Sequence, residues 1–525
     1  MHCAIFWTTA QAGIMAEAEE NPSSEERRHS HGFHIRRPRL SRADTRAEYK
    51  RILGHLEFHS GRALAMFLLC LLVAGVVAFV PQYVDLEPAA RWTLGIVVFC
   101  GLLWMTEAIP AFAVALLAIG LQIMILGQPG GVMNPEGDPK SWEMFVEPWA
   151  SPSMWLFFGG FILAKASSRT GLDRSLAGNL LRLAGSKPER VLLVAMATTF
   201  VFSMFLSNTA TAAMMIAILG PMLGSLKAPG ASRALILGVA FSANLGGMGT
   251  IIGTPPNAIA SGLLGDVYAI DFLKWMLFGL PPAILLLAGL WWALSKRVRL
   301  ASFQLENPDS SDAAVKSAKS SDRAPRWQRW VVLVLIVATI GLWLTGTWHG
   351  IPTAVISFIP IVFFSITGVI RAKDIRSLDW DILILLAGGL SLGVGVSESG
   401  LAEWIAGKLG TLDLAPWAMG MIFGLLTLAL SNFMSNTAAS NILIPIGIAA
   451  GAASGGSVEA AAFAVPMALS ASAAMCLPIS TPPNAIAYAS GRVRSRDFLL
   501  PGLILGLLAC PLATLWSRLL LTWLG

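Results

Sequence analysis

The tripeptide Ser207-Asn208-Thr209 stands inside a long apolar stretch, and it recurs in the second half of the chain as Ser435-Asn436-Thr437. A second motif, Thr254-Pro-Pro-Asn-Ala-Ile-Ala260, recurs unchanged as Thr481-Pro-Pro-Asn-Ala-Ile-Ala487. The spacing is nearly constant, with 228 residues between the tripeptides (207 to 435) and 227 between the longer motifs (254 to 481). The matching residues are polar residues and prolines, so chance similarity between apolar helices does not explain the repeat.

The composition of the chain excludes a water-soluble enzyme. Of its 525 residues, 55% are hydrophobic and 13% are charged. Soluble domains carry about 25% charged residues. We interpret the net charge of +6 as Lys and Arg collected in cytoplasmic loops, and we expect no nucleic-acid partner.

Apolar stretches of roughly 20 residues, the length of a membrane crossing, follow one another along the chain. They predict an all-α polytopic membrane protein with about eleven transmembrane helices. The stretches that carry the motifs are too long for one straight crossing and too short for two. Polar, non-helical backbone at that depth is tolerated only where it lines a cavity or is buried in protein. We therefore expect two re-entrant hairpins, at 191–224 and 416–450, and two broken helices, at 233–262 and 458–490.

The distribution of charge predicts the orientation in a cell inner or plasma membrane. If the hairpins enter and leave on the same side, Lys and Arg gather in one set of loops, and the opposite loops carry only Lys140 and Lys408. The positive-inside rule then places the N-terminus in the cytoplasm and the C-terminus outside. An odd number of crossings separates the two copies, so the second repeat is inverted.

Five segments follow from this topology. They are a cytoplasmic basic N-terminal segment (1–60), a first transmembrane helix (61–90), a first inverted repeat (91–295), a cytoplasmic linker (296–328) and a second inverted repeat (329–525). Within the first segment, residues 42–58 form either a basic amphipathic helix on the inner leaflet or a disordered arm.

Each motif predicts a helix that starts in the middle of the membrane. Ser, Asn or Thr accepts hydrogen bonds from the first free N–H groups of a helix, and Pro fits its first position. The predicted capping pairs are Ser207 and Asn208, Thr254 and Pro255, Ser435 and Asn436, and Thr481 and Pro482. A helix start carries free N–H groups and about half a positive charge. Four such starts together form an anion site without Lys or Arg.

The segments that precede these starts also end there, and they bring carbonyl, hydroxyl and amide oxygens. Oxygen atoms of unwound backbone are typical ligands for Na⁺ in transporters. A bound cation offsets part of the cost of carrying a dianion through lipid. Hydrogen bonding between helices is the alternative role for Ser, Asn and Thr in a membrane. Two copies, each a similar distance before a Pro-Pro-Asn, favour a binding site.

Both pairs of motifs, together with Trp104-Met-Thr-Glu107-Ala-Ile-Pro110, resemble the divalent anion:sodium symporter (DASS) family, which carries dicarboxylates, citrate and sulfate. The resemblance covers about residues 91–525. It implies a homodimer in membrane lipid that works by an elevator mechanism. It also implies import of a di- or tricarboxylate, above all a C4-dicarboxylate such as succinate, malate or fumarate, with Na⁺ as the co-transported ion.

The resemblance also assigns site residues. The residues expected to bind substrate are Ser207, Asn208, Thr209, Thr254, Ser435, Asn436, Thr437, Thr481 and Pro482. The residues expected to bind one Na⁺ are Ser203, Ser207, Asn208 and Gly253, and those expected to bind the other are Ser431, Asn436 and Ser480.

Several alternatives remain open at the level of sequence. Lys165 lies in an apolar run and is either a side chain that snorkels to the interface or a fixed counter-charge for the substrate. A fixed charge would suit a sodium-independent dicarboxylate exchanger of the same fold, and a symporter of sulfate or another divalent anion is a further alternative. An anion channel requires a continuous polar pore. A membrane-embedded hydrolase requires a base near Ser207 or Ser435, and neither motif holds His, Asp or Glu. We therefore expect a transporter and not an enzyme.

Overall fold

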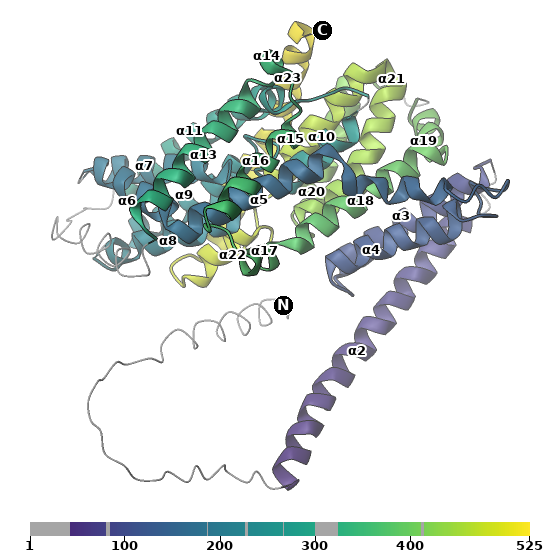
Figure 1. Cartoon of the computed structure of the whole chain (residues 1–525), viewed down its shortest axis with the longest axis horizontal. Coiled ribbons are helices and arrows are strands. Elements are labelled where there is room, and N and C mark those ends of the chain that lie inside the picture. Colours follow the sequence, from purple (N-terminus) through teal and green to yellow (C-terminus); the bar gives the residue numbers. More distant parts are fainter. Residues whose placement is uncertain are drawn as a thin grey trace. The chain divides into compact units, whose positions relative to one another are not determined.

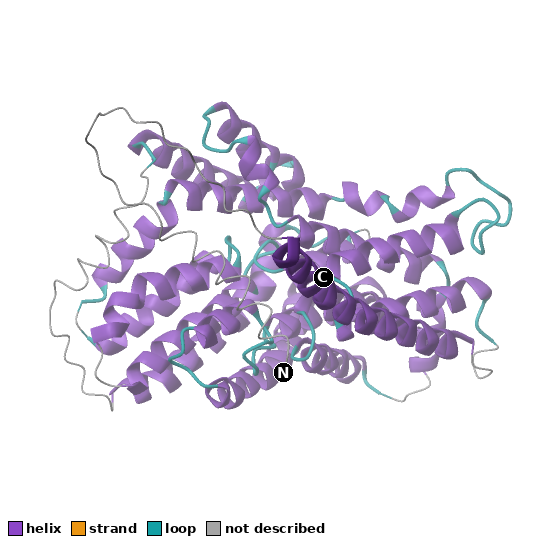
Figure 2. Ribbon diagram, turned by 90° about the horizontal axis from the view of Figure 1, so that it is seen from below, coloured by secondary structure: helices purple, strands orange, loops and turns teal. Residues whose placement is uncertain are grey.

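In the computed structural model, the parts of the chain that are described consist of helices and loops (Figures 1 and 2). The described residues are 42–79, 85–185, 187–225, 229–265, 267–299, 324–410 and 414–524. The predicted N-terminal segment up to residue 41, and residues 300–323 of the predicted linker, lie outside them. The described residues divide into two units, with the boundary between Ala65 and Met66. Residues 42–58 are helical, as part of α2 (Arg42–Phe79).

The remaining helices follow in chain order. In the first half they are α3 (Pro88–Thr106), α4 (Ala111–Gln122) with a π-helical extension (Ile123–Gly127), α5 (Pro152–Thr170), α6 (Leu172–Leu183), α7 (Pro188–Ser203), α8 (Asn208–Ser225), α9 (Pro229–Gly247), α10 (Pro255–Leu264) and α11 (Phe272–Arg299). In the second half they are α13 (Arg326–Leu344), α14 (Gly346–His349), α15 (Thr353–Ile356), α16 (Phe358–Ile366), α17 (Ala372–Arg376), α18 (Trp380–Glu398), α19 (Leu401–Gly410), α20 (Pro416–Ser431), α21 (Asn436–Ser472), α22 (Pro482–Ala489) and α23 (Ser495–Leu524).

Within the described residues, seven helices are long and apolar enough to cross a membrane. Shorter apolar helices accompany them: Ala111–Gly127, Asn208–Gly220, Thr353–Ile366 and Pro416–Ser431. These helices confirm the predicted all-α polytopic membrane protein. The total of about eleven crossings stays a prediction, because the short helices do not meet a length criterion for spanning.

One predicted span, 351–370, is not a single helix. It divides at Ser357 into α15 and α16. Pro360 has no N–H to donate to the carbonyl of Ile356, so the helix is interrupted there. The Ser357 side chain is buried and lies against Gly159 of α5, where an added Cβ would stand 2.6 Å from Ser357 Cβ.

The helices break at both repeated motifs, as the sequence predicts. α7 ends at Ser203 and α8 begins at Asn208, and in the second half α20 ends at Ser431 and α21 begins at Asn436. Seven residues separate α9 from α10 (248 to 254), and nine separate α21 from α22 (473 to 481). α21 is itself interrupted at Gly455 and Gly456. The breaks are confirmed, whereas the inverted relation of 91–295 to 329–525 stays a prediction.

Close contacts between α4 and α18 fix one side of the helical assembly. Gly388 of α18 lies against Ala115 of α4, where an added Cβ would stand 2.5 Å from Ala115 Cβ. One helical turn further along α18, buried Gln122 donates from Nε2 to Ser391 Oγ at 2.9 Å. α21 packs on α18 as well, and Asn441 Nδ2 donates to the carbonyl of Leu385 at 3.0 Å.

Three contacts join segments that the charge pattern assigns to the cytoplasmic side. Arg169, near the end of α5, pairs with Asp374 of α17. Arg329 Nε donates to the carbonyl of Thr170 at 3.0 Å. Arg492 Nη1 donates to the carbonyl of Leu223, near the end of α8, at 2.8 Å. Hence segments far apart in the sequence meet through these three Arg residues.

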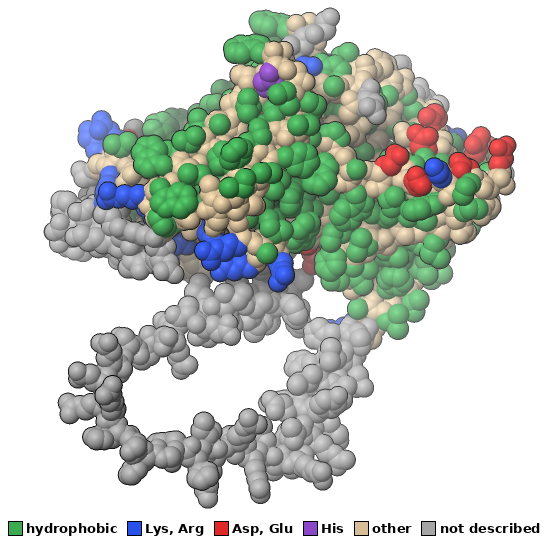
Figure 3. Space-filling view, viewed as in Figure 1, with side chains coloured by type: hydrophobic (Ala, Val, Ile, Leu, Met, Phe, Trp, Pro, Cys, Tyr) green, Lys and Arg blue, Asp and Glu red, His purple; other side chains and the backbone are tan. Residues whose placement is uncertain are grey.

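Basic and acidic side chains also lie largely apart from each other on one face of the protein. Figure 3 shows most of the Lys and Arg side chains of this face toward one end, and Asp and Glu side chains gathered at the other end around a single basic side chain. Exposed acidic residues precede α3 and follow α4 in the sequence. Asp85 and Glu87 come before α3, and the residues after α4 are Glu136, Asp138, Glu143 and Glu147. Most of these belong to a predicted outer loop, so the separation agrees with the positive-inside pattern.

We predict that Gly388→Ala lowers the apparent unfolding temperature of the purified protein. The added methyl group meets backbone atoms of Ala115, and such overpacking costs typically about 1–3 kcal/mol. Thermal unfolding in detergent measures the effect. Gly120→Ala on α4 is the matched control, because nothing lies within 4 Å of its added Cβ. Equal unfolding temperatures for the two variants would contradict the close packing of α4 on α18.

Candidate functional site

A group of buried oxygen atoms surrounds the first tripeptide. Ser203 Oγ is fully buried and donates to the carbonyl of Ala243 at 2.6 Å. One end of the Asn208 side-chain amide faces three oxygens: Ser203 Oγ at 2.5 Å, and the carbonyls of Ala243 at 3.2 Å and Gly253 at 3.3 Å. Oxygen atoms gathered in this way require either an amide N–H₂ turned toward them or a cation between them. We call Ser203, Asn208 and the carbonyls of Ala243 and Gly253 the first cluster. It contains three of the four predicted ligands of one Na⁺: Ser203, Asn208 and Gly253.

The unwound backbone between α9 and α10 is held in place by Asn257. Its Nδ2 donates to the carbonyls of Gly247 at 2.8 Å and Thr250 at 2.7 Å. Glycine is required where the loop passes closest to its neighbours. A Cβ on Gly253 would stand 2.5 Å from the Gly247 carbonyl oxygen, and one on Gly247 would stand 2.7 Å from Asn208 Nδ2. The loop therefore presents its carbonyls to Asn208 because these positions lack side chains.

The second half builds the same loop with the same bonds. Asn484 Nδ2 donates to the carbonyls of Met475 at 2.9 Å and Leu477 at 3.0 Å. These acceptors are 228 and 227 residues after Gly247 and Thr250 (475 − 247 and 477 − 250), which is the spacing of the motifs. Asn257 and Asn484 are both fully buried. The sequence analysis left both residues out of the site, although they are the fourth residue of the repeated motif.

Among the described residues within four positions of the second tripeptide, four buried side-chain oxygens have no hydrogen-bond partner: Ser431 Oγ, Asn436 Oδ1, Ser440 Oγ and Asn441 Oδ1. Ser431 and Asn436 are the two that belong to the predicted Na⁺ ligands. A buried acceptor without a donor costs about 1–3 kcal/mol, and a bound cation would remove that cost. The third predicted ligand, Ser480, donates to Asn432 Oδ1 at 3.1 Å, and Asn432 also accepts from the Cys476 N–H at 3.0 Å. Asn432 is a further site residue that the sequence analysis missed.

All four predicted helix starts are present, but the predicted side-chain cap at Thr254 is wrong. Ser435 Oγ accepts from the Ala438 N–H at 3.1 Å, and Thr481 Oγ1 accepts from the Asn484 N–H at 3.4 Å. Thr254 stands at the corresponding position before α10, yet its side chain makes no capping bond. The Asn257 N–H is taken by the Thr254 carbonyl at 3.1 Å, which leaves the hydroxyl group available for another partner.

The two halves meet at Asn244 in the last turn of α9. Its Nδ2 donates to Thr481 Oγ1 at 3.0 Å and to Asn484 Oδ1 at 3.3 Å. Because the neighbouring Ala243 carbonyl belongs to the first cluster, one turn of helix touches both halves. The structure thus brings the first cluster and the second Thr-Pro-Pro-Asn loop into one polar region.

The predicted site residues differ in exposure. Ser207, Asn208, Thr209, Asn436 and Thr437 are half-buried, Ser203, Gly253, Thr254, Ser431, Ser480 and Thr481 are buried, and Ser435 and Pro482 are exposed. The apolar neighbours follow the same asymmetry: Phe433 is 75% exposed and Ile479 is 68% exposed, whereas Ile252 in the first half is 8% exposed. α10 packs against α5 and α18, and α22 packs against α8 and α9. The loop of the second half is therefore more exposed than the loop of the first half.

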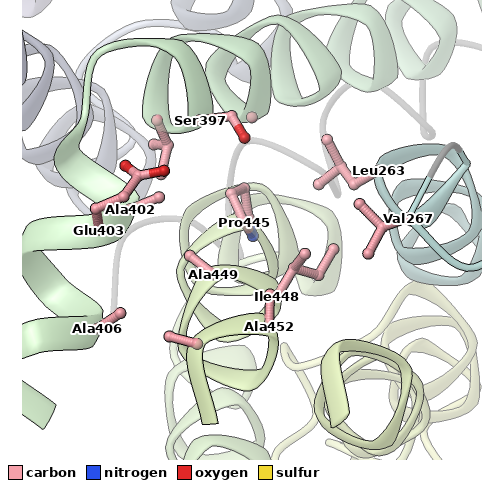
Figure 4. A pocket seen from close by; sticks show the side chains of 13 residues that line it. Leu263, Val267, Ser397, Ala402, Glu403, Ala406, Pro445, Ile448, Ala449 and Ala452 are labelled. Atoms are coloured by element: carbon pink, nitrogen blue, oxygen red, sulfur yellow. The ribbon is translucent and has the colours of Figure 1, made fainter. Parts of the chain in front are cut away.

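A separate cavity of about 260 Å³ lies between α10, α18, α19 and α21 (Figure 4). Its walls are mainly apolar, with Leu263, Val267 and Ile448 among them, and Glu403 is its charged residue. None of the predicted site residues lines it. An apolar wall does not replace the water around a dianion, so this cavity is not the candidate substrate site.

The charge of Lys165 acts on a carboxyl group of the protein, which is compatible with both interpretations of this side chain. Burial raises the pKa of the Asp379 carboxyl, which stands just before α18, and the charge of Asp381 raises it further. The positive charge of Lys165 acts in the opposite direction on the same pKa. Lys165 thus lies near a carboxylate of the protein itself.

Interrupted helices around a buried polar region define a secondary transporter. Residues 101–468 match the sequence profile of the CitMHS family, described as citrate transporter. The chain is 31% identical over 470 residues to the sodium-dependent dicarboxylate transporter SdcS of Staphylococcus saprophyticus, which covers 84% of this chain and 87% of the relative. It is 30% identical over 477 residues to SdcS of Staphylococcus aureus, with 85% and 87% covered. The chain therefore belongs to the citrate transporter family, and it is a multi-pass membrane transporter and not an enzyme.

Two solved structures share the fold. The YdaH transporter of Alcanivorax borkumensis superposes with a TM-score of 0.51 at 16% identity, covering 78% of this chain and 96% of that one. MtrF of Neisseria gonorrhoeae superposes with a TM-score of 0.52 at 14% identity, covering 79% and 95%. At these identities the likeness concerns the fold alone.

We predict that Na⁺ raises the apparent unfolding temperature of the wild-type protein and that Ser203→Ala removes most of this rise. A ligand that binds only the folded state stabilises it, and the variant lacks one oxygen of the first cluster. Thermal unfolding in NaCl and in choline chloride measures the difference. Thr199→Val is the control, because the buried Thr199 hydroxyl bonds its own helix at the Ala195 carbonyl (2.6 Å). An equal Na⁺ effect in both variants would contradict a cation site at Ser203.

Proposed function

We propose that this protein imports a C4-dicarboxylate such as succinate, malate or fumarate together with Na⁺. The observation that supports the proposal is the pair of oxygen clusters beside the matched helix breaks. The first contains Ser203, Asn208 and the Gly253 carbonyl, and the second contains the unpartnered oxygens of Ser431 and Asn436. The SdcS relatives are named as sodium-dependent dicarboxylate transporters, which agrees with this assignment.

The substrate in this proposal binds between the helix starts that follow the clusters. The first turns of α8, α10, α21 and α22 supply N–H groups and positive dipole ends for the carboxylates. The residues proposed for this contact are Asn208, Thr209, Thr254, Asn436, Thr437 and Thr481, with Ser207, Ser435 and Pro482 at the edges of the same motifs. Two Na⁺ ions in the clusters neutralise a dianion, so the loaded site crosses the membrane without net charge.

Coupling to Na⁺ is favoured over sodium-independent exchange by the SdcS relatives, which are named as sodium-dependent. An exchanger would use a fixed positive charge at the substrate in place of mobile ions, and Lys165 is the residue that the sequence offers for that role.

The asymmetric exposure of the site supports an inward-facing state of an elevator in a homodimer. In this proposal α10 rests on α5 and α18, whereas the exposed Pro482 and Ile479 line the open side. The chain after α22 continues into Arg492, Arg494 and Arg496, which the positive-inside rule assigns to the cytoplasm. Thus the N-terminus lies inside, the C-terminus lies outside, and the site opens toward the cytoplasm.

Purified protein in liposomes tests the proposed coupling. We expect an inward Na⁺ gradient to drive accumulation of labelled succinate, and an equal K⁺ gradient to drive none. Liposomes loaded with malate and free of Na⁺ are the control for exchange. Uptake that needs internal malate and ignores Na⁺ would contradict the symport, and stronger competition by sulfate than by malate would reassign the substrate.

We predict that Asn208→Ala and Asn436→Ala each reduce succinate uptake to the level of empty liposomes. Each substitution removes an amide from a cluster and from a helix start, while size-exclusion profiles stay those of wild type. Asn134→Ala is the matched control, because the Asn134 amide bonds the Gly127 carbonyl at 3.2 Å in the loop after α4. Normal uptake by both site variants would refute the proposed site.

A further inference from the structure

Asn244 occupies a position between the first oxygen cluster and the loop of the second half. It is 2% exposed, and its neighbours Ala243 and Leu245 are fully buried. The Ala243 carbonyl accepts from Ser203 Oγ at 2.6 Å and lies 3.2 Å from the Asn208 amide. The next side chain, Asn244, turns to the other half and donates to Thr481 Oγ1 at 3.0 Å. Two adjacent residues therefore contact different halves: the Ala243 carbonyl contacts Ser203 and Asn208 of the first cluster, and the Asn244 side chain contacts the loop of the second half.

The second bond of Asn244 strengthens this connection. Its Nδ2 also lies 3.3 Å from Asn484 Oδ1, and Asn484 holds the second loop through the carbonyls of Met475 and Leu477. Thr481 Oγ1, in turn, caps α22 by accepting from the Asn484 N–H. Asn244 thus contacts both residues that set the shape of the second Thr-Pro-Pro-Asn loop.

The matching position in the second half makes no such connection. Gly247 corresponds to Met475 by the shared bond from the motif asparagine, so Asn244 corresponds to Ser472 (472 − 244 = 228). Ser472 Oγ donates to Ala468 of its own helix at 3.1 Å. Within the described residues, the bond from one half to the motif of the other therefore runs from Asn244 and has no counterpart at Ser472.

We propose that Asn244 is a positioning residue that couples Na⁺ at the first cluster to the substrate loop of the second half. A cation bound among Ser203, Asn208 and the Ala243 carbonyl fixes the last turn of α9. The fixed turn then holds Asn244 against Thr481 and Asn484, so the start of α22 is formed before the carboxylate arrives. This inference rests on the proposed function, and it adds a link between the halves that Ser472 does not duplicate in the second half.

The effect of Na⁺ on substrate affinity tests this coupling. In wild-type proteoliposomes, we compare the half-saturating succinate concentration at low Na⁺ with the value at saturating Na⁺. We expect the ratio of the two values to be about tenfold or more, a typical size for coupled sites. In Asn244→Ala, this ratio falls below about twofold, while the maximal rate at saturating Na⁺ and succinate is retained. Linkage requires the reciprocal effect of succinate on the half-saturating Na⁺ concentration to fall equally. A variant that merely loosens the fold would lower the maximal rate and leave the ratio unchanged.

Two further variants complete the experiment. Ser472→Ala is the matched control and keeps the wild-type ratio, because Ser472 bonds its own helix. Asn244→Ser places the residue of the second half at this position, and it decides the question if Asn244→Ala does not fold. If a folded Asn244 variant keeps the wild-type effect of Na⁺ on the half-saturating succinate concentration, this inference is overturned and the proposed function is not. Sodium-independent uptake by the wild-type protein overturns the proposed function, and this inference with it.

Discussion

Polar backbone in the middle of a membrane must find its hydrogen-bond partners inside the protein, and this requirement governs the centre of the structure. Two buried asparagines, Asn257 and Asn484, each donate twice to the loop before their own helix and so satisfy four carbonyls. Oxygens of Ser203 and Asn208 lie close together, and buried oxygens of Ser431 and Asn436 lack hydrogen-bond donors. These are the atoms that we propose as ligands for a cation.

The two halves share this construction and differ in how it is used. The first-half loop is covered by packing of α10 on α5 and α18, while Phe433 and Ile479 of the second half are largely exposed. Asn244 reaches from the first half to Thr481, whereas Ser472 bonds only within its own helix. This difference in exposure is the observation on which the proposed inward-facing state rests.

The helix breaks could be predicted from sequence because Pro and clustered Ser, Asn and Thr are conspicuous in apolar runs. The capping roles of Ser435 and Thr481 followed from residue type alone. The missing cap at Thr254 could not be predicted, because it depends on which atom takes the Asn257 N–H. Asn244 also escaped prediction, since it resembles any polar helix residue and its partner lies 237 residues away. The break at Ser357 was not predicted, because residues 351–370 form a continuous apolar run. Its prediction would have required the rule that Pro360 interrupts a helix.

The central claim is that matched helix breaks hold Na⁺ in two oxygen clusters and the dicarboxylate between them. Cryo-electron microscopy of the protein in lipid nanodiscs, with and without Na⁺ and succinate, tests it most directly. We expect ion density among Ser203, Asn208 and the Gly253 carbonyl and beside Ser431 and Asn436, with succinate at the starts of α8 and α21. Succinate density in the apolar cavity between α10 and α19, or clusters that stay empty at saturating Na⁺, would contradict it.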